Sequence, residues 1–365
     1  MLLPSLRISG GVKEALRLAE EMQATGIDIA VAALWRSEHE LDCPIVPVLP
    51  LSSFYAKRTT APLQYPVLLL LFLWRILRLL CTSPKTRYVL FMTHFSTFPM
   101  AWLAPWLDWY CFNQDVEWMF IPDGIGRRLL RRFILATSRR ASVITTNAYI
   151  SGRYLFEDIR PVSQASIWAT EFWIDPDSTP IADRDIDVVM LPRRGHMKRL
   201  DLYQEALAAL KAASIRTAVM TPDSDIQASL APIVPVCLLR PTNEEMRQLY
   251  GRSKIFLLLS DTEGFGLPPL EAMASSCVPL CRDSGGPRIY MDGALSSNLI
   301  PFETSVSEIV QRVQALLADP DSLTTLSHIA RDRFMVGLNT TATERRQCLA
   351  TLVNKLAETT SAARQ

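Results

Sequence analysis

One strand-and-turn segment in the second half of the chain constrains the fold more than any other. Lys254–Leu259 is a short, mainly apolar run, which is typical of a strand buried on both faces of a parallel sheet. Leu270–Ala274 are good helix formers, and Pro268 and Pro269 suit the first turn of a helix. The segment therefore predicts a strand, a tight turn and a helix, which is the repeating unit of a parallel α/β domain.

The turn between this strand and helix contains Gly264, Phe265 and Gly266. Glycines let a backbone approach a ligand closely, and the free N–H groups at a helix start favour an anion. Glu263 and Glu271 flank the turn, and sugar hydroxyls are suitable donors to such carboxylates. The turn by itself leaves a second interpretation open, because many parallel α/β domains contain a glycine turn that binds nothing.

A longer stretch of sequence favours a ligand-binding turn over one that binds nothing. Glu263 and Glu271 lie eight positions apart around Gly-Phe-Gly-Leu-Pro, and Ser284–Pro287 reads Ser-Gly-Gly-Pro. Together they resemble the nucleotide-sugar-binding half of the retaining glycosyltransferases of family 4 (group 1), which have the GT-B fold. The resemblance covers almost the whole chain and is strongest from 186 to 290. It implies an α/β architecture of two Rossmann-like, doubly wound domains facing a cleft, with a C-terminal helix that crosses back to the first domain.

The resemblance and the local patterns together give a plan of the domains. We expect a Rossmann-like acceptor domain over 1–168, a linker over 169–187, a Rossmann-like nucleotide-sugar domain over 188–340, and a crossing helix and tail over 341–365. A length of 365 residues suits two domains that each bury their own core. Pro, Asp and Ser cluster in the linker and periodicity vanishes there. Asp183–Asp185 matches the D-x-D metal signature of a different glycosyltransferase fold, but its place in a linker favours a plain turn.

A second glycine turn opens the chain. The pattern predicts a strand over Leu2–Ile8, a helix over about Val12–Thr25 and a strand over Ile27–Leu34, with Gly10 and Gly11 in between. The full G-x-G-x-x-G is missing, so the residues alone leave a turn without a ligand open. The resemblance implies that Gly10 and Gly11 form a loop beside the phosphates of the donor.

His94 follows the predicted strand Arg87–Met92. Ligands in open parallel sheets bind outside the carboxyl ends of strands, so this position would point into a ligand site. The alternative is a structural histidine. Members of the family have a histidine near the donor sugar at a similar strand end, and His94 is the best match.

A cationic cluster follows the strand predicted at the start of the second domain. Arginine can clamp a pyrophosphate bidentately and lysine adds a point charge. The family carries an arginine and, five residues later, a lysine at this turn. Arg193 and Lys198 have that spacing, with Arg194 as a possible substitute. Pro192 and Arg199 depart from the glycines usual in the family, so the loop would differ in shape, and a purely structural cluster is the alternative.

The resemblance also implies a mechanism. The acceptor hydroxyl would attack on the face from which the diphosphate leaves, so the anomeric configuration is retained and the leaving phosphate acts as the base. The nucleotide-diphosphate sugar is the donor substrate, and neither a metal nor another cofactor is obligatory. The predicted catalytic residues are Glu263, His94, Arg193 and Lys198, and the predicted donor-binding residues are Gly10, Gly11, Arg193, Lys198, Gly264, Phe265, Gly266, Leu267 and Glu271.

Three segments bear on the acceptor and on the location of the protein. The apolar run Pro66–Trp74 is shorter than the ~20 residues of a membrane span, so 66–80 is expected to be a helix that is buried on the sheet or touches a bilayer with its leucines. The basic amphipathic segment 127–140 is either a solvated face or a surface for anionic lipid headgroups or a phosphate-bearing acceptor. The polar run Asn113–Glu117 is either solvated or a contact for the acceptor. We expect a glycan or lipid-linked acceptor, in bacterial cell-surface polysaccharide synthesis, at the inner face of a membrane.

Composition excludes some classes of function. A net charge of +1 provides no general electrostatic basis for binding nucleic acid. The seven cysteines are scattered without a CxxC pair, which favours reduced thiols and a cytoplasmic location. The N-terminal residues lack the long apolar region of a secretory signal. A sugar-nucleotide epimerase and a catalytically inactive GT-B scaffold remain the alternatives to a transferase.

The end of the chain is predicted to be helical. Apolar periodicity predicts helices over about Val306–Ala318, Ser322–Val336 and Thr341–Glu358, with a break between the last two.

Overall fold

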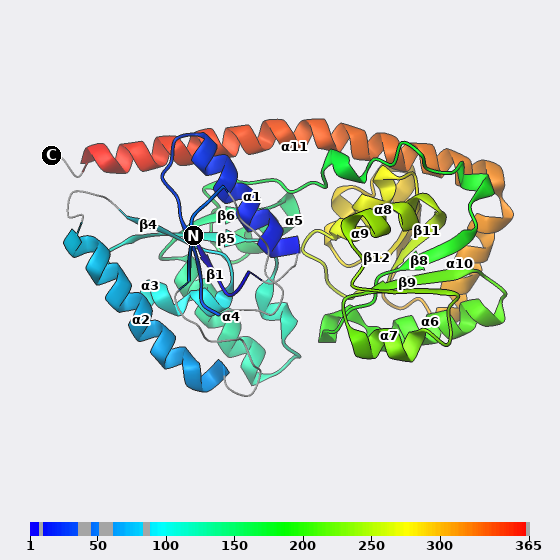
Figure 1. The fold of residues 1–365 in the computed structure, drawn as a ribbon, viewed down its shortest axis with the longest axis horizontal. Coiled ribbons are helices and arrows are strands. Elements are labelled where there is room, and N and C mark those ends of the chain that lie inside the picture. The colour runs from blue at the N-terminus through cyan, green and yellow to red at the C-terminus, as the bar shows by residue number, and fades with distance from the viewer. Residues whose placement is uncertain (7–9, 36–44, 51–60, 83–87, 363–365) are drawn as a thin grey trace. The chain divides into compact units, whose positions relative to one another are not determined.

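The computed structural model describes residues 1–6, 10–35, 45–50, 61–82 and 88–362. They fold into two compact units, which are described separately (Figure 1). Unit 1 combines 1–118 and 123–167 with the end of the chain from Thr343, and unit 2 combines 119–122 with 168–342. The predicted strand residues Arg7, Ile8 and Arg87 lie outside the described residues.

Unit 1 is built on a parallel sheet whose described strands follow the order β3-β2-β1-β4-β5-β6-β7. This order reverses between β1 and β4, as in a doubly wound Rossmann-like domain, where ligands bind beyond the carboxyl ends of the strands at the reversal. The Rossmann-like first domain predicted from the sequence is thereby confirmed. The strands are β1 (Leu2–Leu3), β2 (Val31–Ala33), β3 (Val48–Pro50), β4 (Val89–Met92), β5 (Asp108–Asn113), β6 (Ser142–Thr145) and β7 (Ser163–Gln164).

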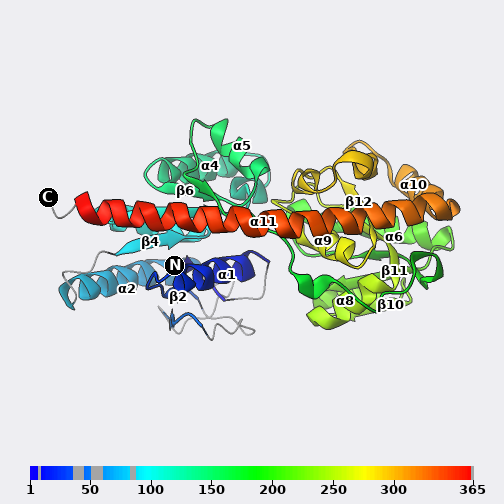
Figure 2. The same cartoon turned by 90° about the horizontal axis from the view of Figure 1, so that it is seen from above.

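Helices cover both faces of this sheet. The face seen from above in Figure 2 carries α1 (Gly10–Ala24) and the last part of α11 (Pro320–Ala362), which run beside each other. Leu18 of α1 and Leu352 of α11 share one buried core with Phe112 of β5. The remaining helices of the unit are α2 (Ala61–Thr82), α3 (Pro99–Leu103), α4 (Ile125–Ser138) and α5 (Ala148–Leu155).

Arg345 holds the end of α11 on unit 1. Its side chain is 4% exposed, and its guanidinium donates to Glu21 at 2.9 Å, to Glu14 at 3.3 Å and to the Ser166 carbonyl at 2.9 Å. Burial raises the pKa of Glu14, although the Arg345 charge acts in the opposite direction. A C-terminal helix that returns to the first domain, as the family resemblance implies, is therefore present.

The predicted break in the C-terminal helices is wrong. Residues Pro320–Ala362 form one continuous helix that passes through Gly337. A Cβ atom at Gly337 would lie 2.0 Å from Cζ2 of Trp168, so this glycine provides room for the indole ring. The predicted break between Val336 and Thr341 therefore falls where a glycine serves a close packing contact inside a helix.

Helix α2 has one buried and one exposed apolar face. Leu68, Phe72 and Ile76 are buried at a spacing of four residues, and the Phe72 ring lies 6.4 Å from that of Trp109. The opposite face leaves Leu70 and Trp74 exposed. The helix is longer than the predicted apolar run, and among the described residues its stretch Gln64–Thr82 is long and apolar enough to span a membrane by length and composition.

Unit 2 repeats the same topology. Its sheet has the order β10-β9-β8-β11-β12-β13 with all strands parallel, and the reversal lies between β8 and β11. The second Rossmann-like domain is thereby confirmed. The strands are β8 (Ile186–Met190), β9 (Thr217–Thr221), β10 (Val236–Leu239), β11 (Ser253–Leu258), β12 (Val278–Arg282) and β13 (Leu299–Ile300).

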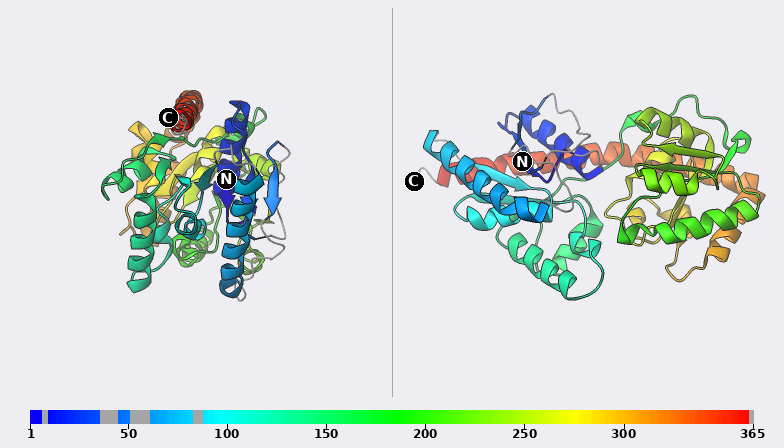
Figure 3. Two further views of the ribbon diagram at one scale, coloured as in Figure 1. Left: turned by 90° about the vertical axis from the view of Figure 1, so that its left-hand side faces the viewer. Right: turned by 60° about the horizontal axis from the view of Figure 1, so that its bottom comes forward.

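The helices of unit 2 divide between the two faces of its sheet. One buried core joins α6 (Leu200–Ala212), α7 (Ser224–Leu230) and α10 (Val306–Ala318) to the strands. Figure 3 (right) brings the green helices α6 and α7 of this face forward. Helices α8 (Asn243–Gly251) and α9 (Leu267–Ala274) lie on the other face, as Figure 1 shows.

The predicted linker is held by one buried arginine. Arg184 donates to the carbonyls of Thr179 at 2.8 Å, Ser253 at 2.7 Å and Ser275 at 2.8 Å. Its neighbour Asp185 forms an ion pair with Arg252. The two aspartates of the D-x-D string therefore flank an arginine with a structural role. Among the described residues, no group of three His, Cys, Asp or Glu side chains could hold a metal ion.

Candidate active site

The sequence-predicted residues of unit 2 gather where its strand order reverses. Arg193 and Lys198 follow β8, and Glu263 follows β11, which is the strand paired with β8. Leu257 of β11 pairs in register with Met190 of β8, so the two loops leave the same edge of the sheet together. This edge is where open parallel sheets bind ligands.

Lys198 and Glu263 form an ion pair at this edge. The Lys198 Nζ donates to Glu263 Oε1 at 2.8 Å, and the Glu263 side chain is 16% exposed. Burial alone raises the pKa of Glu263, but the Lys198 ammonium, the Ser260 hydroxyl and the Arg193 charge outweigh it and hold the pKa below its usual value. Glu263 is therefore an ionised acceptor at neutral pH.

The backbone of Glu263 is fixed by the Ser284–Pro287 turn. The Glu263 N–H donates to the Ser284 carbonyl at 3.0 Å, and the Gly286 N–H donates to the Glu263 carbonyl at 3.0 Å. A Cβ atom at Gly286 would lie 2.6 Å from the Phe265 backbone. The second glycine of this string is thus required by the close approach of two turns.

The Gly264–Gly266 turn is anchored from behind by aromatic side chains. Gly266 has a φ of 81° and precedes α9, and the Tyr290 hydroxyl donates to its carbonyl at 2.7 Å. The Phe265 ring is buried, with centroids 5.9 Å from Trp168 and 5.6 Å from Tyr290. The side chain of Phe265, predicted to bind the donor, is directed into this aromatic cluster, so its contribution to the turn is structural support.

The start of α9 offers few free donors to an anion. Pro268 and Pro269 occupy its first turn and have no N–H group, which leaves the N–H groups of Leu267 and Leu270 among the first four helical residues. Charge for a phosphate must therefore come mainly from side chains at this site.

A small cavity of about 40 Å³ lies between these loops. The Arg193 Nε is buried and has no hydrogen-bond partner among the described residues, so a donor is available there. The cavity is lined by Leu191, Arg193, Lys198, Tyr203, Phe256, Leu258, Ser260, Glu263 and Pro268.

Glu271 extends from α9 toward Tyr250. Burial raises the pKa of Tyr250 well above its usual value, and the Glu271 carboxylate adds to this effect.

Arg194 is engaged elsewhere. Its guanidinium forms ion pairs with Asp223, at 3.6 Å, and with Asp225, and its side chain is 58% exposed. Of the two arginines considered from the sequence, the structure therefore brings only Arg193 to the cavity with Lys198 and Glu263.

The predicted residues of unit 1 lie at its own strand-order reversal. Gly10 and Gly11 begin α1, and a Cβ atom at Gly11 would lie 3.2 Å from Oε1 of Gln114. His94 follows β4, and burial lowers its pKa to about 4, so its ring is neutral. His94 Nδ1 accepts the Ser96 N–H at 3.2 Å, which places the ring proton on Nε2.

The polar run Asn113–Glu117 is not a solvated loop throughout. Asn113 is 3% exposed and Glu117 is 7% exposed. The Glu117 carboxylate accepts the Phe95 N–H at 2.8 Å, directly after His94, and burial raises the pKa of Glu117 well above its usual value. Glu117 supports the backbone of the His94 turn.

Sequence reasoning missed several residues that hold the site in place. They include Ser260 and Tyr290, as well as Tyr203, whose hydroxyl accepts the Leu259 N–H at 3.0 Å. Each looks like an ordinary core or loop residue in the sequence. Only their closeness to the glycine turn identifies them.

Part of the chain is similar in sequence to known glycosyltransferases. Residues 232–333 match the family described as Glycosyl transferases group 1. "Putative glycosyltransferase 41" of Sulfolobus islandicus filamentous virus is 56% identical over 45 residues, which are 12% of this chain and 14% of that protein. "Putative glycosyltransferase ORF378" of Acidianus filamentous virus 2 is 35% identical over 82 residues, 22% of this chain and 21% of that protein. These matches thus span less than a quarter of either viral protein.

Solved structures are similar over nearly the whole chain. Sucrose-phosphate synthase from Thermosynechococcus elongatus has a TM-score of 0.73 at 16% identity and covers 99% of this chain and 96% of its own. Anabaena HepE, in complex with UDP and glucose, has a TM-score of 0.70 at 13% identity, over 96% and 98% of the two chains. WaaG, a glycosyltransferase involved in lipopolysaccharide biosynthesis, has a TM-score of 0.66 at 17% identity, over 93% and 94%. At these identities the likeness concerns the fold. Residues 232–333 thus match the group 1 glycosyltransferases, and the chain as a whole has the GT-B fold.

Proposed function

We propose that this protein is a retaining glycosyltransferase that moves a sugar from a nucleotide-diphosphate sugar to a hydroxyl of a glycan or lipid-linked acceptor. The observation that carries this proposal is the ionised Glu263 paired with Lys198 beside the unpartnered Nε of Arg193, at the strand-order reversal of unit 2. The solved complex of HepE with UDP-glucose shows that a protein of this fold binds such a donor.

Arg193 and Lys198 would hold the diphosphate. A lysine ammonium has three donors, so Lys198 can keep Glu263 and still bind a phosphate oxygen. The two prolines at the start of α9 remove helix N–H donors, which makes these two side chains the main balance for the leaving diphosphate.

Glu271 and Glu263 would bind the ribose and the sugar of the donor. Glu271 accepts from the ribose hydroxyls, and Glu263 accepts from the sugar hydroxyls and stabilises the positive charge that develops on the sugar ring. The leaving phosphate takes the proton of the acceptor hydroxyl, so no dedicated protein base is required. His94, in unit 1, is neutral with a donor at Nε2, which suits a hydrogen bond to a sugar oxygen.

Donor hydrolysis with a panel of UDP-, GDP- and ADP-sugars tests this proposal. We expect the protein to release the nucleoside diphosphate from one of them, and Glu263→Gln to retain nucleotide binding but lose most of the rate. An epimerase would return an isomerised nucleotide sugar without releasing the nucleotide. A folded protein that binds none of the panel would leave only the inactive scaffold.

We also propose that α2 rests on the surface of a membrane. Its face formed by Leu70, Trp74 and Leu77 is exposed by 67%, 58% and 47%, and the Arg78 guanidinium lies 5.5 Å from the Trp74 ring centre. The opposite face packs in unit 1, which favours a helix lying in the interface over one that spans. With this contact we propose a lipid-linked acceptor and a location at the inner, cytoplasmic face of the membrane.

The basic helix α4 supports the membrane proposal less directly. The structure confirms a helix there, with Ile125 and Leu129 exposed, but Arg127 pairs with Asp123 and Arg131 pairs with Glu157. Part of its positive charge is therefore balanced within the protein. A bacterial cell-surface polysaccharide pathway stays a prediction, which the fold likeness to WaaG supports.

Vesicle sedimentation tests whether the exposed face of α2 binds a membrane surface. We expect the protein to sediment with vesicles that contain anionic lipid, and Leu70→Gln with Trp74→Gln to remove this binding at unchanged thermal stability. A matched control is Leu155→Gln, which changes an exposed leucine on α5. Equal sedimentation of all variants would rule out α2 as the contact.

A further inference from the structure

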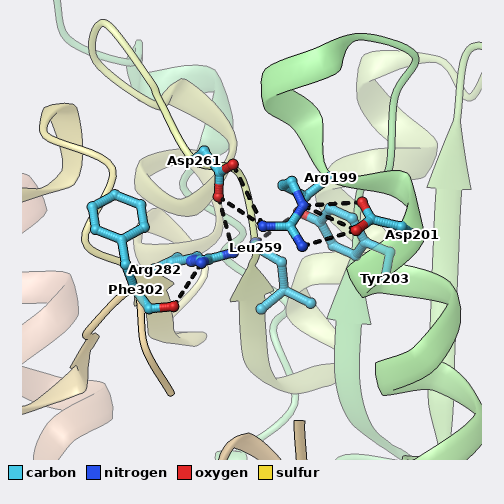
Figure 4. Close-up of polar contacts among 7 residues, drawn as sticks. All are labelled: Arg199, Asp201, Tyr203, Leu259, Asp261, Arg282 and Phe302. Atoms are coloured by element: carbon cyan, nitrogen blue, oxygen red, sulfur yellow. Dashed lines mark hydrogen bonds and ion pairs between the residues drawn. The ribbon is translucent and has the colours of Figure 1, made fainter. Parts of the chain in front are cut away.

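A charged network joins the loops that follow β8 and β11 to the end of β12 in unit 2 (Figure 4). Arg199 directly follows Lys198, Asp261 precedes Glu263 by two residues, and Arg282 is the last residue of β12. Arg199 Nη1 lies 3.3 Å from Asp261 Oδ1, and Arg282 Nη1 lies 2.9 Å from the same oxygen. One carboxylate thus holds two guanidinium groups, and we call these three residues the arginine clamp.

Arg199 occupies a backbone conformation that glycine would adopt more easily. Its φ of 49° and ψ of 52° lie in the left-handed region, at the start of α6. The side chain offsets this strain, because it donates to both carboxylate oxygens of Asp201, with distances of 2.8 to 3.1 Å, as well as to Asp261. A glycine would relieve the backbone but would have no side chain to reach Asp261.

Asp261 is held from two directions. Its N–H donates to the Met197 carbonyl at 2.8 Å, which joins the loop of Glu263 to the loop of Lys198. On the other side, Arg282 is 9% exposed and donates to the Phe302 carbonyl at 2.7 Å, with its guanidinium 5.0 Å from the Phe302 ring centre. The carboxylate is therefore fixed relative to the sheet, and Arg199 is fixed relative to the carboxylate.

We propose that the arginine clamp positions Lys198 against Glu263 before a donor arrives. The clamp residues act through their neighbours: Arg199 orients the lysine that binds phosphate, and Asp261 orients the loop of the acid that faces the sugar. Holding both groups in place beforehand lowers the ordering cost of donor binding. This inference rests on the donor site of the proposed function.

Arg199→Gly is the discriminating variant. The probes are UDP, GDP and ADP, measured by calorimetry with the wild-type protein and then with the variant. We expect thermal stability to be unchanged or higher because strain is relieved, yet affinity for the nucleotide that binds to fall about three- to tenfold. A merely structural residue would not separate stability from affinity in this direction.

Arg240→Gly is the matched control. Arg240 has the same φ of 49°, but it follows β10 and its side chain donates to the Pro222 carbonyl at 3.3 Å. We expect the same or a higher stability and the affinity of the wild type. Asp261→Asn, which removes the charge between the two guanidinium groups, should weaken binding as Arg199→Gly does.

A double-mutant cycle tests whether Arg199 acts through Lys198. In a Lys198→Ala background, Arg199→Gly should cost less than about twofold in affinity, because the residue it positions is gone. The proposed role of the arginine clamp would be wrong if the losses of nucleotide affinity in Lys198→Ala and Arg199→Gly were fully additive. It would also be wrong if Arg199→Gly and Asp261→Asn both bound the nucleotide as the wild type does. A wild-type protein that binds none of the three nucleotides would overturn the proposed function itself.

Discussion

Lys198 Nζ donates to Glu263 Oε1 at 2.8 Å, and this pair links the loops that follow β8 and β11. The lysine both stabilises the ionised acid and supplies a charge for phosphate. Removing it therefore has two effects, a lost contact to the donor and an uncompensated carboxylate.

Lys198→Ala should weaken binding of a nucleoside diphosphate by about 1–3 kcal/mol, because a charge-assisted contact is lost. Glu271→Ala should cost a similar amount through the ribose. Titration calorimetry with UDP measures both. Arg194→Ala is the control, since its side chain is engaged by Asp223 and Asp225, and it should bind as the wild type does. Wild-type affinity in Lys198→Ala and Glu271→Ala together would mean that the site lies elsewhere.

The pKa of Glu263 predicts an acid limit for the site. The folded-state pKa of Glu263 lies below the usual value of 4.5. The ionised carboxylate therefore contributes fully to the free energy of unfolding above about pH 4.5, and this contribution is lost as the pH falls through the lower, folded-state pKa. UDP affinity should consequently be level from pH 7 to about pH 5 as far as Glu263 is concerned. In Lys198→Ala the pKa of Glu263 should rise, and the ¹³C shift of its carboxyl carbon should then titrate at higher pH than in the wild type.

His94 predicts a different pH dependence, this time of stability. Its pKa falls from 6.5 to about 4 on folding, so the unfolded chain binds the extra proton between these values and stability decreases as the pH drops through that window. Urea unfolding at pH 7 and pH 4.5 should show a loss that is about 2 kcal/mol smaller in His94→Gln than in the wild type. Equal losses in the two proteins would contradict a buried, neutral ring.

Gly337→Ala tests the contact between α11 and Trp168. Alanine favours a helix over glycine by about 1 kcal/mol, yet its Cβ atom would lie 2.0 Å from the indole. We expect a net loss of about 1–3 kcal/mol from overpacking. Gly126→Ala in α4 is the control, because nothing lies within 4 Å of its Cβ position, and it should stabilise the protein slightly. Chemical denaturation of both variants measures whether each substitution lowers or raises the free energy of unfolding.

Arg345→Met should destabilise unit 1, because it leaves Glu14 and Glu21 without their buried partner. Breaking a buried pair on one side costs about 3–5 kcal/mol. Adding Glu14→Gln and Glu21→Gln to this variant should restore much of the loss, since the stranded charges are then gone. No restoration would show that packing of the arginine stem, and not charge, holds the end of α11.

Local chemistry explains why much of this architecture could be predicted. An apolar run such as Lys254–Leu259 has few ways to be buried other than as a central parallel strand, and all of it except Leu259 lies in β11 (Ser253–Leu258). Thr242 and Glu245 form a capping box at the start of α8, and this pairing is also local because both groups act within one turn of the same helix. Glu263 and Glu271 could be selected because their spacing around the glycine turn is itself a local pattern.

The chain by itself determined which residues carry charge, which segments form most of the strands and helices, and where the turn at Gly264–Gly266 occurs, because these follow from neighbours in the sequence. Only the tertiary structure decided that Lys198 pairs with Glu263, that Phe265 turns into an aromatic cluster, and that α11 continues through Gly337. The physical reason is that each of these depends on a partner 65, 25 or 169 positions away, and a burial or an ion pair has no local signature until the fold brings the two together.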